Sequence, residues 1–95
     1  MATYVLLSTL TDDGAGTVTK NPARIRDVNK EIEKLGVKVT GQYALLGPYD
    51  FLSIVEAPDN ETIARVSAEL AARGSVKIMT LAAIPIDKFI SSVKK

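Results

Sequence analysis

The sequence predicts one small α+β domain of the split β-α-β (ferredoxin-like) kind, with the element order β-α-β-β-α-β and a short C-terminal helix. Three observations support this prediction. Four stretches rich in β-branched and aromatic residues alternate with two stretches whose apolar residues recur at helical spacing. Each of these helical stretches ends at a glycine. The chain has 95 residues, of which 46% are apolar and 24% charged, as expected for a single folded domain over residues 1–95.

The first part of the chain predicts a strand, a loop and a helix. Residues 3–10 are rich in Tyr, Val and Leu and predict a strand. Residues 11–16 are of turn-forming types and predict a loop. Asn21 followed by Pro22 predicts the start of a helix, and Gly36 predicts its end. The apolar stripe of this helix consists of Ile25, Val28, Ile32 and Leu35.

The second predicted strand leads into a tight turn. Residues 37–46 alternate bulky and polar side chains, so we expect Val39 and Tyr43 on one side of the strand. Gln42 is expected on the other, wetter side. The run Gly47-Pro48-Tyr49-Asp50 then predicts the turn that joins this strand to the next one.

The remaining elements are a strand, a helix, a strand and a tail helix. Residues 51–56 predict a short apolar strand, and Pro58 opens a helix that is expected to stop at Gly74. Residues 76–84 predict the fourth strand. The tail carries an apolar helical stripe that we expect to be buried against the domain or a neighbouring molecule. This stripe consists of Ile86, Phe89, Ile90 and Val93.

The predicted topology leaves one apolar face of the sheet without cover. The first and third strands are expected at the centre, with both main helices on one face. Apolar side chains nevertheless occur on both faces of these strands, where Tyr4, Leu6, Phe51 and Val55 alternate with Val5, Leu7, Leu52 and Ile54. The tail stripe is too small to cover the second face. We therefore expect a stable dimer, or a multiple of dimers, in which sheets from two copies of the chain meet.

The composition excludes several kinds of chemistry and of partner. There is no Cys and no His, so disulfides, thiolate catalysis and the commonest metal ligand are excluded, and no metal or cofactor is expected. Twelve Lys and Arg against eleven Asp and Glu give a net charge of +1, so no nucleic-acid partner is expected. No stretch approaches the ~20 apolar residues of a membrane span, and the N-terminus lacks the features of a signal peptide. We expect no membrane partner and a cytoplasmic location.

Several short segments together resemble a known family. They are Tyr4-Val5-Leu6, Thr11 with Gly14, Pro22 with Arg24, Tyr43, the Gly47–Asp50 turn and Val55-Glu56-Ala57-Pro58-Asp59. In their order and spacing they are similar to the GYD domain family, which is named for that turn, and the resemblance covers nearly the whole chain. It implies a dimeric α+β barrel in which two sheets pack face to face, and it implies no particular activity.

The cleft beside the turn is the predicted functional site, because two phenols and a carboxylate cluster there. Its candidate ligand-binding residues are Tyr43, Tyr49, Asp50 and Arg24. The alternative is that Asp50 caps the turn backbone while both tyrosine rings pack a strand or an interface. Glu56 is expected to form a structural ion pair with Arg24 or Lys20.

Two functions remain open at this point. The first is a homo-oligomeric module, without enzymatic activity, that binds a small ligand near the subunit interface or acts as an interaction or regulatory protein. The second is a cofactor-independent enzyme, of a monooxygenase-like or acid–base kind, that uses Asp50 with Tyr43 or Tyr49. The first is preferred, because no constellation of nucleophile and base emerges from the sequence, which has no His and no Cys.

Overall fold

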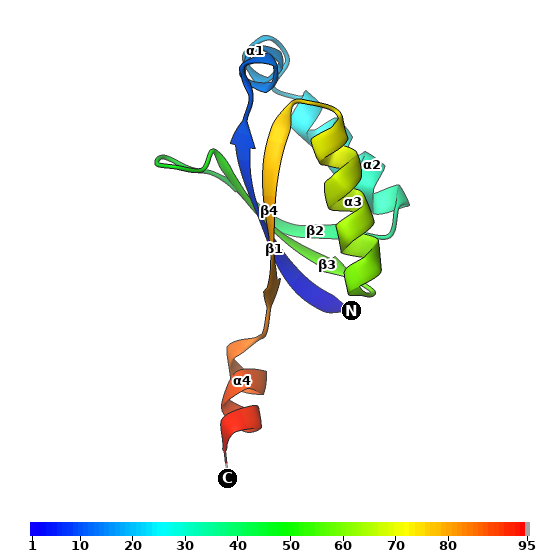
Figure 1. The fold of residues 1–95 in the computed structure, drawn as a ribbon, viewed down its shortest axis with the longest axis vertical. Coiled ribbons are helices and arrows are strands. Elements are labelled where there is room, and N and C mark those ends of the chain that lie inside the picture. The colour runs from blue at the N-terminus through cyan, green and yellow to red at the C-terminus, as the bar shows by residue number, and fades with distance from the viewer. Residues whose placement is uncertain (95) are drawn as a thin grey trace.

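A computed structural model describes residues 1–94 of the chain, in which helices pack on one face of an antiparallel sheet (Figure 1). The strands are β1 (Ala2–Leu10), β2 (Lys38–Ala44), β3 (Phe51–Ala57) and β4 (Val76–Ala83). The helices are α1 (Asp12–Lys20), α2 (Arg24–Lys34), α3 (Asn60–Ala72) and α4 (Ile86–Val93).

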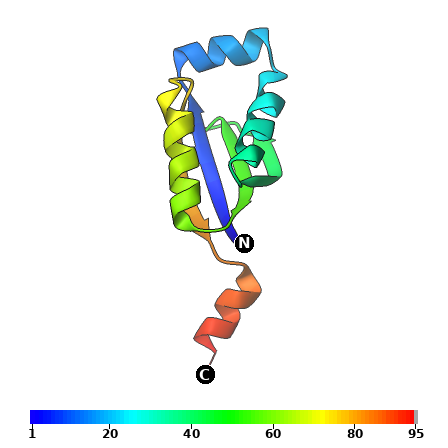
Figure 2. The same cartoon turned by 90° about the vertical axis from the view of Figure 1, so that its right-hand side faces the viewer.

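The sheet has the strand order β2-β3-β1-β4, and all neighbouring strands are antiparallel. β1 and β3 are therefore central, as the sequence predicted. α2 and α3 lie side by side over the same face, and α1 crosses the end of that layer (Figure 2). This is a small α+β fold of the ferredoxin-like kind.

The core lies between the sheet and the two covering helices. Tyr4 and Leu6 of β1 and Val55 of β3 are buried on this face. Ile32 of α2 and Val66 of α3 pack against them in one apolar cluster. The Tyr4 hydroxyl donates a hydrogen bond to Asn60 Oδ1 at 2.5 Å, which ties the central strand to the start of α3. The helices therefore bury one apolar face of the sheet.

The predicted loop over residues 11–16 is wrong, because these residues begin helix α1. The Thr11 hydroxyl accepts a hydrogen bond from Gly14 N at 3.1 Å and so caps the helix. It also donates to Gly74 O at 2.6 Å, which anchors the helix start to the loop before β4. Asn21, expected to cap the next helix, instead ends α1, since its N–H donates to Thr17 O. Residues 12–16 are therefore helical, although they are of turn-forming types, and contacts with the loop before β4 anchor them.

Strand β2 contains an irregularity that the alternating sequence pattern did not predict. Val39 pairs with Val55 and Gly41 pairs with Ile54, so the register shifts by one residue at Thr40. After this bulge the two sides of the strand are exchanged. Gln42 lies opposite Ser53 on the helix-covered face, whereas Tyr43 lies on the other face. The expectation that Val39 and Tyr43 share one side is therefore wrong.

Helix α4 extends away from the rest of the chain and gives the molecule its length of 53 Å (Figure 1). It forms where the sequence predicted a tail helix. Its apolar stripe is not buried against the domain, because Phe89, Ile90 and Val93 are 48%, 52% and 61% exposed. That part of the prediction is wrong for the single chain. Burial against a neighbouring molecule stays a prediction.

We expect opposite effects of alanine at the two glycines of α1. A Cβ at Gly14 would lie 1.9 Å from the backbone oxygen of Ser75, so Gly14→Ala should lower the unfolding free energy by about 1–3 kcal/mol. A Cβ at Gly16 would meet no atom within 4 Å, so Gly16→Ala should raise it by about 0.5–1 kcal/mol. Urea unfolding of both variants measures the difference. Equal effects would contradict the close packing of α1 on Ser75.

Candidate functional site

The face of the sheet opposite the helices carries an apolar surface. In β1, Val5 and Leu7 alternate with the buried residues and therefore point to this face. Residues paired with them on β3 and β4 lie on the same face. Val5, for example, lies between Ile54 of β3 and Leu81 of β4. We call this surface the open-face patch, and it consists of Val5, Leu7, Leu52, Ile54, Met79 and Leu81.

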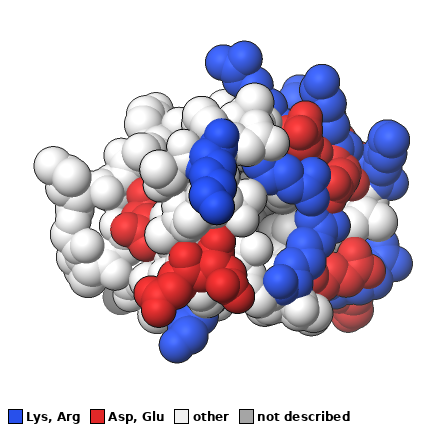
Figure 3. Space-filling view, turned by 90° about the horizontal axis from the view of Figure 1, so that it is seen from above, with Lys and Arg blue, Asp and Glu red and all other residues white. Residues whose placement is uncertain are grey.

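The open-face patch is in contact with solvent in the single chain. Met79 and Leu81 are 47% and 42% exposed, and no helix within residues 1–94 covers them. Charged residues gather instead over α2 and α3, at the right in Figure 3, whereas the left-hand edge of that view is free of charge. Contiguous exposed apolar surfaces are common at the interaction sites of folded domains.

The predicted site residues of the turn belong to the margin of this patch. Tyr43 is 60% exposed and lies opposite Leu52 on the open face. The Tyr49 hydroxyl points to the same face, where it donates to Met79 Sδ at 3.8 Å. Leu46, at the tip of the same loop, is fully exposed. The two phenols therefore share one side of the sheet with apolar neighbours.

Asp50 is engaged with the backbone of the central strand. Its Oδ2 accepts a hydrogen bond from Leu10 N at 2.7 Å, and its own N–H donates to Ser8 O at 2.8 Å. Leu45 N donates to Asp50 O at 2.7 Å, which closes the loop. The carboxylate thus fastens the turn to the end of β1. This agrees with a structural use of Asp50, although its bond goes to a neighbouring strand and not to the turn itself.

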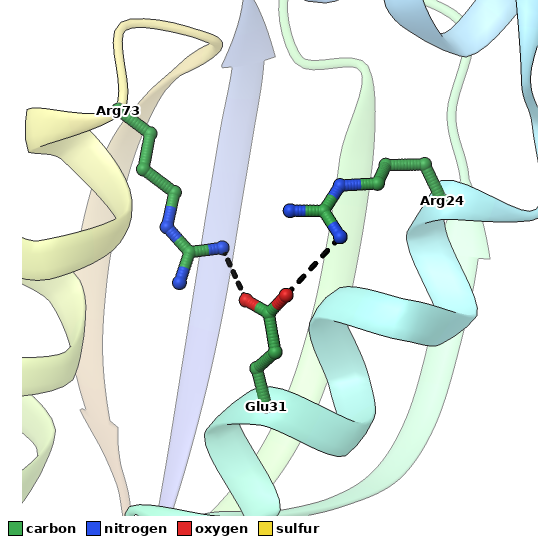
Figure 4. A network of polar contacts seen from close by, with 3 residues as sticks. All are labelled: Arg24, Glu31 and Arg73. Atoms are coloured by element: carbon green, nitrogen blue, oxygen red, sulfur yellow. Dashed lines mark hydrogen bonds and ion pairs between the residues drawn. The ribbon is translucent and has the colours of Figure 1, made fainter.

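Arg24 lies on the helix-covered side and belongs to a cluster of charges that sequence reasoning missed. Its Nη1 is 3.1 Å from Glu31 Oε1, and Arg73 Nη1 contacts Glu31 Oε2 (Figure 4). Glu31 therefore bridges the start of α2 and the end of α3. The Arg73 contact is an ion pair whose atoms are not aligned as a hydrogen bond, although it shields Oε2 from solvent. The expected ion pair of Glu56 with Arg24 or Lys20 is wrong, because Arg24 pairs with Glu31 and, within residues 1–94, Glu56 forms no ion pair.

The carboxyl of Glu31 is held in its charged form by this arrangement. Its close contact with the Arg73 guanidinium, more than that with Arg24, holds the pKa of Glu31 below its ordinary value of 4.5. Asp59, which caps α3, also has a lowered pKa because its carboxylate accepts hydrogen bonds from the Thr62 hydroxyl and the Thr62 backbone N–H. Both carboxylates favour folding in their charged state.

The four predicted site residues do not form one cluster. Tyr43 and Tyr49 approach the open face, Asp50 binds the backbone of β1, and Arg24 lies between the helices. Their roles in ligand binding stay predictions. Within residues 1–94, no group of three or more His, Cys, Asp or Glu is placed to hold a metal ion. In the same part of the chain, no helix is long and apolar enough to cross a membrane.

We expect Glu31→Gln to reduce the dependence of stability on acid. The lowered pKa means that Glu31 stabilises the fold above about pH 4.5, and that this stabilisation is lost as the pH falls through the folded-state pKa. The wild-type melting temperature should therefore exceed that of Glu31→Gln at pH 7, and the gap should narrow towards pH 3. Glu33→Gln on the same helix is the control, because Glu33 has no ion pair in the described structure. A gap that stays constant with pH would contradict the ion-pair role.

The chain is similar to a known protein family, to a relative in sequence and to a solved structure. The family model described as GYD domain matches residues 4–93. The chain is 58% identical over 95 residues to the "Glutamine synthetase and cystathionine beta-lyase binding protein" of Thermus thermophilus, a match that covers 99% of this chain and 100% of the relative. The fold is similar to that in the crystal structure of TTHA0845 from Thermus thermophilus, with a TM-score of 0.59. That likeness has 23% sequence identity and covers 90% of this chain and 95% of the other. The family match over nearly the whole chain and the close relative show that the chain belongs to the GYD domain family.

Proposed function

We propose that this protein is a homo-oligomeric interaction module, without enzymatic activity, that binds a metabolic enzyme of the glutamine synthetase or cystathionine β-lyase type. The observation that carries the proposal is the open-face patch, an apolar surface on a domain whose sequence has no His and no Cys. The name of the relative that is 58% identical over its whole length supports the choice of partner.

Self-association through the sheet is the first part of the proposal. Two sheets that pack face to face interleave their side chains in a layer about 10 Å thick. The open-face patch supplies such side chains from three neighbouring strands, β1, β3 and β4. Tyr43 and Tyr49 lie at its margin, and tyrosine rings suit an interface, because they combine a large apolar surface with a polar hydroxyl. A dimer of this kind is a two-sheet barrel with helices on the outside.

Helix α4 belongs to the same association in this proposal. It has only eight residues, and isolated helices shorter than about 12–15 residues are marginal in water. Its apolar stripe gains a stabilising contact if it packs against a neighbouring copy of the chain. The extension of α4 away from its own domain places it within reach of such a copy (Figure 1). The tail then adds apolar area to the contact between the sheets.

The geometry gives less support to an enzyme built on Asp50 with Tyr43 or Tyr49. The Asp50 carboxylate is anchored to the end of β1, because its Oδ2 accepts the Leu10 N–H, so only Oδ1 is left to act as a general base. Tyr43 is directed to the open face, where its neighbour is Leu52. The carboxylate and this phenol are therefore engaged separately, and an interaction module is the better supported function.

We expect Leu81→Glu to separate the subunits. Leu81 is partly exposed in the single chain, so a charge is tolerated there in the monomer, but it would be buried without a partner between two sheets. The dissociation constant of the dimer should rise by at least about 100-fold, equivalent to about 2.7 kcal/mol. Light scattering after size exclusion measures the mass over a range of concentrations. Ala82→Glu, which adds the same charge on the opposite face of β4, is the control and should leave the dimer intact.

Binding to the two enzymes is tested directly by titration calorimetry with purified glutamine synthetase and cystathionine β-lyase from the same organism. We expect at least one of them to bind with a dissociation constant of about 1 μM or tighter. Size exclusion of the mixture should show one complex that contains both proteins. If neither enzyme binds at about 50 μM of each protein, the choice of partner is wrong. The open-face association would still be judged independently by the Leu81 variant.

A further inference from the structure

The helix-covered side of the sheet contains a cavity of about 160 Å³, on the face opposite the open-face patch. α1 covers one end of it, and α2 and α3 form its sides. Engineered cavities on the order of 150 Å³ accept a molecule as large as benzene. The cavity is therefore large enough for a small organic molecule and too small for a macromolecular segment.

The two arginines of the charge cluster line this cavity. Arg24 comes from α2 and Arg73 from the end of α3, and their guanidinium groups face each other across Glu31 (Figure 4). Two positive charges therefore meet one negative charge, and within residues 1–94 neither arginine has a second acidic partner. Each guanidinium has further N–H groups available for a planar anion. This end of the cavity has one unbalanced positive charge.

The remaining walls are of two kinds. Aliphatic and aromatic side chains form most of the surface, contributed by Ile25, Val28, Phe51 and Leu70. A chain of hydrogen bonds forms the rest. Asn29 Nδ2 donates to Gln42 Oε1 at 2.7 Å, and Gln42 Nε2 donates to Ser53 Oγ at 3.2 Å. Ser53 is only 7% exposed, which makes it the buried polar residue of this face.

A cavity with an unbalanced guanidinium charge and a mainly apolar wall fits an anion with a carbon body. We propose that this cavity binds a small organic carboxylate. The carboxylate contacts Arg24 and Arg73, and its carbon chain packs on Val28, Phe51 and Leu70. Inorganic phosphate supplies the charge but has no carbon body to occupy the apolar walls. The site goes beyond the proposed function, since it lies on the other face of the sheet and contains none of the association surface.

The test is a titration of the isotope-labelled full-length protein with hexanoate, followed by the backbone amide resonances in two-dimensional NMR. We expect saturable shifts at Thr17, Val28 and Ser53, with a dissociation constant of about 1 mM or tighter. Hexanamide, which has the same carbon chain without the charge, should bind at least about tenfold more weakly, and so should inorganic phosphate.

Two variants test the charges in the same titration. Arg73→Gln should weaken hexanoate binding by at least about tenfold, and Arg24→Gln provides a second variant if the first unfolds. Arg26→Gln removes an exposed arginine of α2 that does not line the cavity, and it should bind like the wild type. The proposal is overturned by an absence of saturation at about 50 mM, by shifts confined to the open-face patch, or by equal binding of hexanamide. If Arg73→Gln and Arg24→Gln both bind hexanoate as tightly as the wild type does, the proposal is overturned as well.

Discussion

The rest of the structure depends on the two-sided apolar character of β1 and β3. Each of these central strands places apolar side chains on both faces of the sheet, and α2 and α3 cover only one of them. Leu6 and Val55 are buried by this packing, whereas Leu7 and Leu52 on the other face are not fully covered. A sheet covered on one face only leaves the apolar side chains of its other face in contact with water. The core and much of the open-face patch thus come from the same two strands.

The connection between β1 and α2 shows how the end of the sheet is closed. α1 has few large apolar side chains, and contacts at its first turn anchor it to the rest of the domain. Thr11 bonds to Gly74 O, and Gly14 packs directly on the Ser75 backbone. Both contacts are with the segment that leads into β4, so α1 covers the space between α2, α3 and the sheet. Gly14 and Ser75 both line the cavity, so this close approach forms part of its wall.

The sequence predicted the elements whose causes are local, and missed those whose causes are distant. Gly36 and Gly74 end their helices with positive φ angles, as their position after an apolar stripe indicated. α1 was missed because its two glycines suggest a turn, although Thr11 caps the helix locally, and its contacts with Gly74 and Ser75 form only in the fold. The bulge in β2 was missed although Gly41, a glycine inside the strand pattern at the point where the register shifts, is a signal for one.

The candidate site was only partly predicted, because its residues are positioned by long-range contacts as well as by local sequence. Tyr43 and Asp50 are near each other along the chain, but the bulge turns Tyr43 to the open face and the Leu10 N–H engages Asp50. Arg24 was selected from its place at a helix start, but its partners Glu31 and Arg73 meet it only after α2 and α3 pack together. No spacing in the sequence indicates that Arg73 lies beside Glu31. Pairs of residues that are distant in sequence, such as Glu31 and Arg73, can be identified only once the fold is known.

The two similar proteins differ in what they indicate about function. At 23% identity, the solved structure supports the arrangement of strands and helices, and folds of this kind occur with many functions. At 58% identity over its whole length, the relative shares most of this chain's residues, but binding of an enzyme depends on a few exposed side chains. Function must therefore be inferred from the surfaces of this chain. Its apolar surface lies on one face of the sheet, and its unbalanced guanidinium charge lies on the other. The two surfaces lie on opposite faces of the same sheet, so a substitution can be chosen on one of them that replaces no side chain of the other.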